Sequence, residues 1–295
     1  MALKYRTVGI TARSDIRGLS RTLKHVIEII RECGATVKID GKRSKRLDAG
    51  KTPVYKHHSE LDLLIVLGGD GTILRTVREL EDYSVPILSI NKGTVGFLAE
   101  LSLSETEQML PMFLQGKGTV EERSLLEITA TRGRKKIWQG KVLNEAVVSQ
   151  GAISRLIDLK TSVNGDPLAT FHADGVIIAT PTGSTAYSLA AGGPIVHPEL
   201  KATILTPINP HSFSQKPIVL PGSDNIEVMI FTKQNKFEDV QVSLTLDGQT
   251  YVTLQRNDTV HAVISKKSVK FLRRNDESFF STLRSKLKWG ERIEE

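Results

Sequence analysis

The sequence contains one cysteine, Cys33, among its 295 residues. A single cysteine cannot close an intramolecular disulfide, so a disulfide-stapled secreted scaffold is excluded. Cys33 follows the apolar positions between Val26 and Ile30, and we interpret it as a buried small hydrophobic residue. The sequence also lacks an apolar run of the ~18 residues that a membrane span needs, and its first residues lack the apolar core of a signal peptide. These absences favour a soluble, cytoplasmic protein that does not bind a membrane.

Motifs for metal ligation and for a serine nucleophile are missing as well. His57 and His58 are adjacent and no cysteine pair exists, so the spacing of a zinc site is absent and we predict no metal ligands in the chain. No Gly-x-Ser-x-Gly sequence is present, which argues against acyl transfer on a serine. Aromatic residues make up 5% of the chain, too few to suggest a surface on which nucleic-acid bases stack. Nucleic acid is therefore not an expected partner.

The remaining composition is that of an ordinary globular protein with a positive charge. Hydrophobic residues make up 39% and charged residues 25%, so the chain is neither disordered nor collagen-like. Its length predicts about two domains. Forty Lys and Arg outnumber 33 Asp and Glu, which gives a net charge of +7. This excess suits nucleic acid, an acidic membrane or phosphorylated small molecules, and composition alone does not choose among them.

Residues 1–120 alternate between strand and helix patterns. The run 62–67 is continuously apolar after its first residue, as expected for a strand that is buried on both faces. The alternation predicts a Rossmann-like α/β domain with an open parallel sheet. The charged segment 41–51 is expected to be a mobile surface loop. Apolar runs predict strands at 7–11, 36–39, 62–67 and 85–90, and helical spacing predicts helices at 23–32 and 73–80.

Residues 121–270 show a different pattern, in which short β-branched and apolar runs follow one another. This pattern predicts a β-rich domain, a sandwich or another layered form. Helical spacing returns only at 185–191 and at 278–289, so 271–295 is expected to be a C-terminal helical segment. The strand-like runs are 125–131, 142–149, 156–163, 169–179, 226–231, 240–246, 251–254 and 259–264.

The sequence Gly68-Gly69-Asp70-Gly71-Thr72 lies between a predicted buried strand and a predicted helix. Ligands of open α/β sheets bind at this edge, and glycines there let backbone amides approach a phosphate. A carboxylate repels phosphate, so Asp70 suggests proton acceptance from a hydroxyl, or a metal ion held between phosphates. The alternative is a tight turn in which Asp70 caps the helix. The spacing gives the two interpretations similar weight.

The segment 179–194 combines Ser and Thr residues with a predicted short helix that ends at Gly192, Gly193 and Pro194. Unpaired amides at a helix start and the neighbouring hydroxyls suit a polar ligand, and Tyr187 offers a flat face for a base. An ordinary capped helix is the alternative. The hydroxyls are more numerous than one cap requires, which favours a ligand site.

Four further segments are uninformative when each is taken alone. The pair at 144–145 is typical of a solvated strand end, and 171–175 combines a strand-edge histidine with an Asp-Gly turn. The segment 206–212 is a loop that prolines fix, and 246–249 predicts a hairpin turn.

Taken together and in this order, these segments resemble the NAD kinase family. The resemblance covers the chain from about residue 61 to its C-terminus and rests on the relative spacing of the motifs. Its most specific part is DGVIIATPTGSTAYSLAAGGPI at 174–195, combined with the Asn-Glu pair at 144–145. The GGDGT sequence alone is weak, because diacylglycerol kinases, sphingosine kinases and phosphofructokinases have related loops. PHSFSQKPIVLP at 210–221 and LDGQ at 246–249 complete the match.

The resemblance implies an activity and an architecture. The activity is transfer of the terminal phosphoryl group of ATP, or of polyphosphate, to the adenosine 2′-hydroxyl of NAD, which gives NADP, with Mg²⁺ on the donor phosphates. The architecture is an α/β domain over 1–120, an NAD-binding β-rich domain over 121–270 and a C-terminal segment, 271–295, that packs on the first domain. A homodimer or homotetramer is also implied.

The resemblance implies a role for each matching residue. Asp70 is expected to be the general base, Glu145 to bind ribose hydroxyls with Asn144 reaching the base, and Asp174 to hold the nicotinamide end. The expected phosphate loop consists of Gly68, Gly69, Gly71 and Thr72. The residues expected to contact NAD are Asp70, Gly71, Arg75, Asn144, Glu145, Arg155, His172, Asp174, Thr185, Ala186, Tyr187, Ser188, Leu189, Ala190, Asn209 and Gln249.

Three alternatives of other classes remain at this stage. A lipid kinase shares the GGDGT loop, but the sequence lacks an apolar lipid-groove signature and carries the Asn144-Glu145 pair. A non-catalytic NAD-binding module would not need Asp70. A nucleic-acid binder is suggested by the net charge alone.

Overall fold

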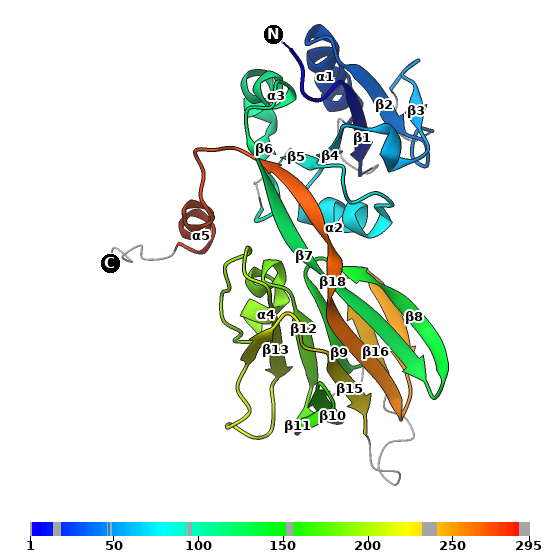
Figure 1. The fold of residues 1–295 in the computed structure, drawn as a ribbon, viewed down its shortest axis with the longest axis vertical. Coiled ribbons are helices and arrows are strands. Elements are labelled where there is room, and N and C mark those ends of the chain that lie inside the picture. The colour runs from blue at the N-terminus through cyan, green and yellow to red at the C-terminus, as the bar shows by residue number, and fades with distance from the viewer. Residues whose placement is uncertain are drawn as a thin grey trace. The chain divides into compact units, whose positions relative to one another are not determined.

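The computed structural model describes residues 2–13, 19–45, 47, 49–91, 93, 96–151, 156–231 and 241–288. The chain divides into two compact units: unit 1 comprises Met1–Glu122 and Val269–Glu295, and unit 2 comprises Arg123–Ser268. Two long strands, β7 (Thr119–Arg132) and β18 (Asp258–Arg273), each begin in one unit and end in the other (Figure 1). Unit 2 is therefore an insertion in the sequence of unit 1.

Unit 1 contains a parallel sheet. Its strands are β1 (Thr7–Ala12), β2 (Thr36–Asp40), β3 (Val54–Tyr55), β4 (Leu63–Leu67), β5 (Ile87–Asn91) and β6 (Leu101–Ser102). The order is β5-β4-β1-β2-β3, with β6 and the end of β18 also paired to β5. All five residues of β4 are buried, which explains its continuously apolar sequence. The predicted α/β architecture with an open parallel sheet is confirmed.

The helices described in unit 1 are α1 (Leu19–Glu32), α2 (Asp70–Glu79), α3 (Thr106–Leu114) and α5 (Phe279–Leu287), with short 3₁₀ turns η1 (His58–Glu60) and η2 (Leu103–Glu105). α1 buries Leu23, Val26 and Ile30 on one face against the sheet core. α3 was not predicted, because Pro111 inside it reads as a helix breaker in a single sequence. α5 begins after Ser278, whose hydroxyl accepts a hydrogen bond from the Ser281 amide (3.2 Å).

Two expectations about the surface of unit 1 need correction. Cys33 is partly exposed rather than buried, because it stands in the turn that ends α1, although it still packs against the core. The segment 41–51 is anchored at two points. Leu47 is buried, and the Arg43 guanidinium donates to both oxygens of Glu79 (2.7 and 2.6 Å).

Unit 2 contains two antiparallel sheets. The first has the order β11 (Asp166–Ala173), β10 (Ile157–Val163), β15 (Ile226–Ile230), β18, with β7 paired to β18 and to β8 (Lys135–Val142). The second has the order β14 (Ile218–Pro221), β13 (Ala202–Ile208), β12 (Gly175–Ala179), β9 (Glu145–Gln150), β16 (Val242–Leu246), β17 (Thr250–Leu254). Buried residues of both sheets form one core, so the β-rich prediction is confirmed as two packed layers.

One predicted strand, 169–179, is two strands in different sheets. β11 ends at Ala173 and pairs with β10, whereas β12 begins at Gly175 and pairs with β9 and β13. The break falls at Asp174, where the chain turns from one layer to the other. An apolar run cannot reveal such a turn, because the residues on both sides of it are buried in the same core.

Candidate functional site

The glycine-rich loop of unit 1 follows β4 directly and leads into α2. Gly68 has a φ of 150°, and a Cβ on it would lie 2.4 Å from Thr72 Oγ1, so only glycine fits there. Its amide donates to the carbonyl oxygen of Ile90 on β5 (2.9 Å). Gly69 is the N-cap of α2, which begins at Asp70, three residues earlier than predicted. The loop therefore lies at the carboxyl end of parallel strands, where phosphate-binding loops occur.

Asp70 is held by backbone amides of a distant segment. Phe97 N donates to Asp70 Oδ2 (3.0 Å) and Leu98 N donates to Oδ1 (3.3 Å). A Cβ on Gly96 would lie 2.2 Å from Asp70 Oδ1, so the segment can approach only because it carries a glycine. Asp70 is the first residue of α2 and not its cap, which removes the capping interpretation. Its carboxylate is thus fixed in direction at a helix N-terminus that favours negative charge.

The segment that holds Asp70 is itself supported by the end of β18. The carbonyl oxygen of Leu98 accepts hydrogen bonds from Ser89 Oγ (3.0 Å) and from the Arg273 guanidinium (3.1 Å). Arg273 also donates to Glu100 (2.9 Å) and to Glu121 (2.9 Å). Sequence reasoning missed Arg273, because it lies 175 positions from Leu98 and belongs to no motif.

Arg75 lies one turn along α2, as predicted, and is partly buried. Its guanidinium donates to the carbonyl oxygen of Ala12 at the end of β1 (3.2 Å). Burial, together with the positive charges of Arg43 and Arg13, lowers the pKa of Arg75. An anionic group would relieve this crowding of positive charge.

In unit 2, the turn at Leu143–Glu145 is clamped by two residues. Asp247 accepts hydrogen bonds from three successive amides, those of Leu143 (3.0 Å), Asn144 (2.8 Å) and Glu145 (3.2 Å). Thr180 Oγ1 donates to the carbonyl oxygen of Leu143 (2.6 Å), and the Thr180 amide donates to that of Asn144 (2.9 Å). The backbone of the turn is therefore satisfied by the protein. The predicted hairpin at 246–249 is confirmed, but its aspartate does more than turn the chain.

Glu145 is buried beside this clamp, with 6% of its surface exposed. One of its oxygens, Oε2, has no hydrogen-bond partner among the described residues. Burial and the negative charge of Asp247 raise the pKa of Glu145 to about 8. A hydrogen bond from the Tyr187 amide acts in the opposite direction and lowers this pKa. The expectation of a solvated strand end is wrong, because residues 145–148 of β9 are all buried within the second sheet.

The hydroxyl-rich segment forms a 3₁₀ turn, η3 (Thr182–Thr185), and a single turn of helix, α4 (Tyr187–Ala190), instead of one helix over 185–191. Several of its hydroxyls bind within the protein: Ser184 Oγ bonds to Val196 and Ser188 Oγ to Thr206 Oγ1 (2.9 Å). Their number is thus explained partly by internal packing. A Cβ on Gly183 would lie 2.2 Å from the carbonyl oxygen of Asn144, so η3 lies directly on the clamped turn.

A second cluster of polar side chains surrounds Asp174. Asp174 precedes the first residue of β12, whereas Thr180 follows its last residue. Gln150 Nε2 donates to Asp174 Oδ1 (2.8 Å) and Asn209 Nδ2 donates to Oδ2 (2.9 Å). Asn209 therefore orients Asp174. The His172 ring forms a hydrogen bond with Asp158 (2.8 Å). A strand of this length separates Asp174 from Thr180 by about 20 Å.

The other residues that are expected to contact NAD lie along η3 and α4, in the hairpin turn after β16, or outside the described residues. Tyr187 is 47% exposed at the start of α4, and Gln249 is exposed in the turn between β16 and β17. Arg155 lies outside the described residues. Thr185, Ala186, Ser188, Leu189 and Ala190 follow Gly183 along η3 and α4.

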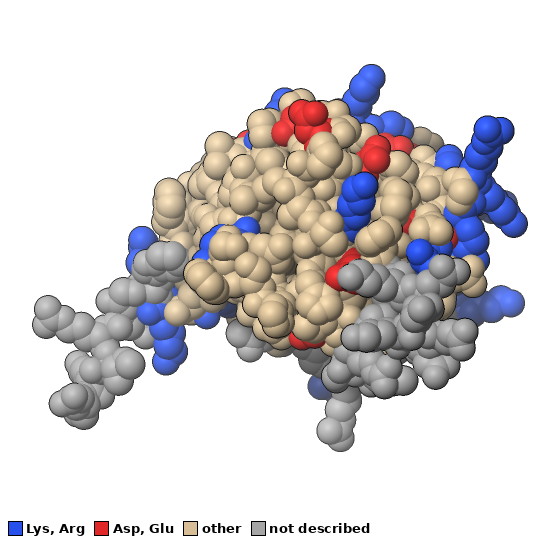
Figure 2. Space-filling model, turned by 90° about the horizontal axis from the view of Figure 1, so that it is seen from below, with Lys and Arg blue, Asp and Glu red and all other residues tan. Residues whose placement is uncertain are grey.

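Figure 2 shows a face whose centre is mostly uncharged, with Lys and Arg mainly around its margin. No basic stripe of the kind that follows a nucleic acid crosses this face. Within the described part of the chain, no helix is long and apolar enough to cross a membrane, and no three His, Cys, Asp or Glu residues are grouped as metal ligands.

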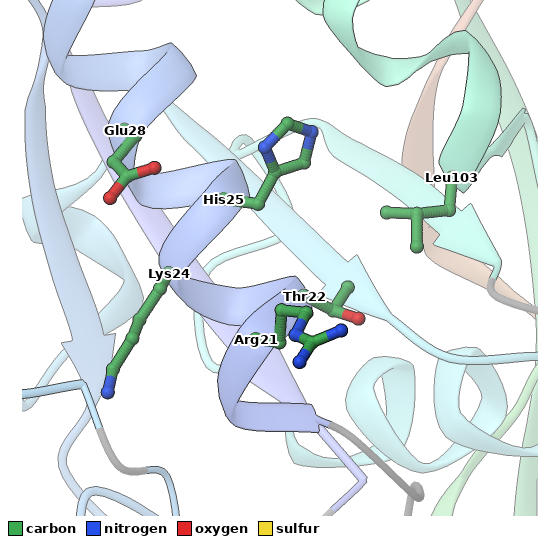
Figure 3. A pocket seen from close by; sticks show the side chains of 6 residues that line it. All are labelled: Arg21, Thr22, Lys24, His25, Glu28 and Leu103. Carbon is green, nitrogen blue, oxygen red and sulfur yellow. The ribbon is translucent and has the colours of Figure 1, made fainter.

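A hollow of about 650 Å³ lies elsewhere on unit 1, along α1 (Figure 3). Arg21, Thr22 and His25 extend from α1 on the side of Leu103, whereas Lys24 and Glu28 point away from it. None of the expected site residues lines this hollow, whose lining residues are Arg21, Thr22, Lys24, His25, Glu28 and Leu103.

Family models match both parts of the chain. The model of the ATP-NAD kinase N-terminal domain matches residues 8–118, and that of the ATP-NAD kinase C-terminal domain matches residues 143–274. Together they cover most of the sequence. The chain belongs to the NAD kinase family.

Similar proteins agree with this membership. NAD kinase of Burkholderia cenocepacia is 36% identical over 291 residues, covering 98% of this chain and 95% of that protein. NAD kinase of Geotalea daltonii is 43% identical over 233 residues, covering 79% and 80%. The resemblance seen in the sequence is thus confirmed, and the chain is an enzyme of the NAD kinase class.

Two solved structures, one of an NADH kinase and one of an NAD kinase, share the fold of this chain. Yeast NADH kinase complexed with NADH has a TM-score of 0.87 at 25% identity and covers 98% of this chain and 90% of that one. NAD kinase from Archaeoglobus fulgidus in complex with ATP has a TM-score of 0.75 at 26% identity, with 96% and 98% covered. The α/β domain and the β-rich domain described above are therefore the NAD kinase architecture.

Proposed function

We propose that this NAD kinase transfers the γ-phosphoryl group of ATP, or a phosphoryl group of polyphosphate, to the adenosine 2′-hydroxyl of NAD and releases NADP. The observation that carries the proposal is Glu145. Its carboxylate is buried beside a turn whose backbone is already satisfied, and its Oε2 has no partner among the described residues, which supports a hydroxyl group from outside the chain as that partner. A ribose offers such a pair of hydroxyls.

The acceptor would bind unit 2 through two separate clusters. Asn144 and Glu145 would hold the adenosine, with Tyr187 and the residues that follow it on α4 against the base. Asp174, oriented by Gln150 and Asn209, would hold the nicotinamide end. A separation of about 20 Å along β12 suits the two ends of an extended dinucleotide. The complex of yeast NADH kinase with NADH supports a dinucleotide as the ligand of this fold.

The donor would use unit 1. Amides of the loop Gly68–Thr72 and the Arg75 guanidinium would bind phosphate oxygens, and Asp70 would accept the proton of the attacking hydroxyl. Since the Phe97 and Leu98 amides fix its direction, Asp70 is preorganised for that proton. The complex of the Archaeoglobus fulgidus NAD kinase with ATP supports a nucleoside triphosphate as donor.

Mg²⁺ fits this arrangement as an ion carried by the donor. The described residues hold no carboxylate cage, and Mg²⁺ in phosphoryl-transfer sites is bound by one or two carboxylates together with substrate phosphates. Mg²⁺ on the donor phosphates would also offset the repulsion between those phosphates and the Asp70 carboxylate. When bound, the ion would neutralise negative charge on the transferred group.

We also propose a cytoplasmic homodimer or homotetramer. Large apolar side chains of unit 2 that remain exposed, including Val219 (48%) and Tyr251 (61%), support burial against a second copy. Light scattering of the purified chain tests this, and a monomeric mass at working concentration would contradict it.

The decisive experiment supplies purified protein with NAD, Mg²⁺ and either ATP or polyphosphate. An NADP-specific dehydrogenase then detects the product, because it does not accept the 3′-phosphorylated isomer. We expect signal with ATP. Product that resists this enzyme would place the phosphate on another hydroxyl, and signal with polyphosphate alone would exclude ATP as donor.

A further inference from the structure

Asp247 is the residue whose contacts exceed what its motif requires. A hairpin turn needs only a residue that tolerates positive φ, and Asp247 has a φ of 48°. It is nevertheless buried, with 5% of its surface exposed, and its carboxylate points away from its own turn into the backbone of another. That backbone belongs to Leu143–Glu145.

Three amide donors converge on this one carboxylate. Oδ2 accepts from Leu143, and Oδ1 accepts from both Asn144 and Glu145. The Asp247 amide returns a hydrogen bond to the carbonyl oxygen of Glu145 (3.0 Å), so the two turns are locked in both directions. A carboxylate that accepts several amides is stabilised in its charged form, and such bonds are stronger than neutral ones.

We propose that Asp247 is the positioning residue of the nucleotide site: it fixes the Asn144–Glu145 turn and places a second carboxylate beside Glu145. The inference rests on the proposed function of Glu145 as the ribose-binding carboxylate. In this role Asp247 acts through the turn and not by contact with the substrate. Its effect on NAD is transmitted through the direction of the turn and through the charge state of Glu145.

The groups around Glu145 agree with a role for that charge. The hairpin contributes Asp247 and α4 contributes the Tyr187 amide. β12 contributes the apolar Ala179 opposite Glu145, and from β7 the Arg123 guanidinium donates to Thr182 of η3 (3.4 Å). Asp247 and burial therefore act together to favour the protonated form of Glu145.

NAD binding without any phosphoryl donor tests the inference. Calorimetry between pH 6 and 9 measures Kd for wild type, Asp247→Asn, Asp247→Glu and the control Asp166→Asn, which makes the same chemical change at an exposed position of β11. For wild type, binding should strengthen as pH rises through about 8, since the ionised Glu145 accepts both ribose hydroxyls. Asp247→Asn should move that midpoint down by about one pH unit. It should also raise Kd about tenfold at high pH, because one carbonyl oxygen cannot hold three amides.

Asp247→Glu keeps the charge but displaces it, so it should keep the midpoint near that of wild type and still raise Kd. If Asp247→Asn does not fold, the Asp247→Glu variant still tests the inference. A wild-type Kd that does not change with pH, or variants that match wild type in both midpoint and Kd, would overturn the inference. Wild type that binds NAD but forms no NADP with any donor would instead contradict the proposed function alone.

Discussion

Asp70 and Glu145 are two acids that the fold treats in opposite ways. Both oxygens of Asp70 accept backbone amides, whereas Glu145 Oε2 has no partner within the described part of the chain. The two amides fix the direction of the Asp70 carboxylate, whereas Glu145 Oε2 can still accept a hydrogen bond. Substitutions at the two positions should therefore affect different kinetic constants.

Replacing Asp70 with Asn should lower turnover and leave NAD binding largely intact. The amide cannot accept the hydroxyl proton, and a positioned general base contributes about 10²–10⁴-fold. Steady-state kcat and calorimetric Kd for NAD measure the two effects separately. Asp166→Asn is the matched control and should match wild type. Near-normal turnover of Asp70→Asn would refute the assignment of the base.

Above about pH 8, where Glu145 is ionised, its replacement with Gln should weaken NAD binding, since a charge-assisted hydrogen bond to the ribose is worth about 1.5–3 kcal/mol. The same substitution should abolish the rise of affinity with pH, because the titrating group is gone. Calorimetry across the pH range shows both. An unchanged Kd would exclude Glu145 from the ribose.

For single residues, the sequence indicated which positions to consider but not which groups they bond to. It selected Asp70, Glu145 and Asp174 from motif spacing, and all three occupy structured polar sites. It could not find Phe97 and Leu98 as the residues that hold Asp70, because backbone amides carry no side-chain signature. The hydrogen bond from Asn209 to Asp174 was not predicted either, and the expected contact of Asn209 with NAD stays a prediction.

Among the elements, η3 and the clamped turn depend on close backbone approach. Gly183→Ala would place a methyl group 2.2 Å from the carbonyl oxygen of Asn144, which is backbone and cannot swing aside. We expect a loss of about 1–3 kcal/mol in stability and a weaker affinity for NAD. Thermal unfolding and calorimetry measure these.

The matched control is Gly93→Ala, since no atom of the described residues, chain neighbours apart, lies within 4 Å of a Cβ at that position. It should change neither quantity. Equal behaviour of the two variants would show that η3 can retreat from the turn, and the packing argument would fail.

Elements with strong periodicity were predicted well, and those without it were not. β4 is a buried apolar run and α1 has a clear apolar face, so both were found. β8 was missed because only Val142 in it is buried and because Lys, Gln and Gly interrupt its apolar residues. The helix expected over 185–191 failed because its hydroxyls bond to neighbouring segments and shorten it to one turn.

At the scale of the whole molecule, Glu145 should make stability depend on pH. Its pKa is about 8 in the folded chain and near 4.5 when unfolded, so the native state binds more protons in this window. The contribution of Glu145 to stability is therefore greatest below about pH 4.5. It falls by at most about 1.4 kcal/mol per pH unit until pH passes 8.

Denaturant unfolding at pH 5.5 and 8, followed through the fluorescence of Trp138 in unit 2, measures this effect. The pH-dependent loss should be larger in wild type than in Glu145→Gln, which does not titrate. Equal losses in the two proteins would mean that Glu145 is ionised in the folded state at both pH values.

The division into units also explains what the sequence left unresolved. The borders fall inside β7 and β18, which are continuous strands, so no Pro- or Gly-rich linker marks them. Only the change of periodicity near residue 120 is visible in the sequence. The contribution of residues after 268 to unit 1 depends on long-range pairing, such as Phe271 with Ile87.

This order of segments has a consequence for how the protein is made. A ribosome releases the chain from its N-terminus, and domains fold as units during synthesis. Unit 2 is contiguous and can fold as soon as it emerges, but unit 1 must wait for β18. Arg273, whose guanidinium supports Leu98 and through it Asp70, is translated after the whole of unit 2. A nascent chain can thus form the two sheets of unit 2 before Arg273 is available to support the segment that holds the Asp70 carboxylate.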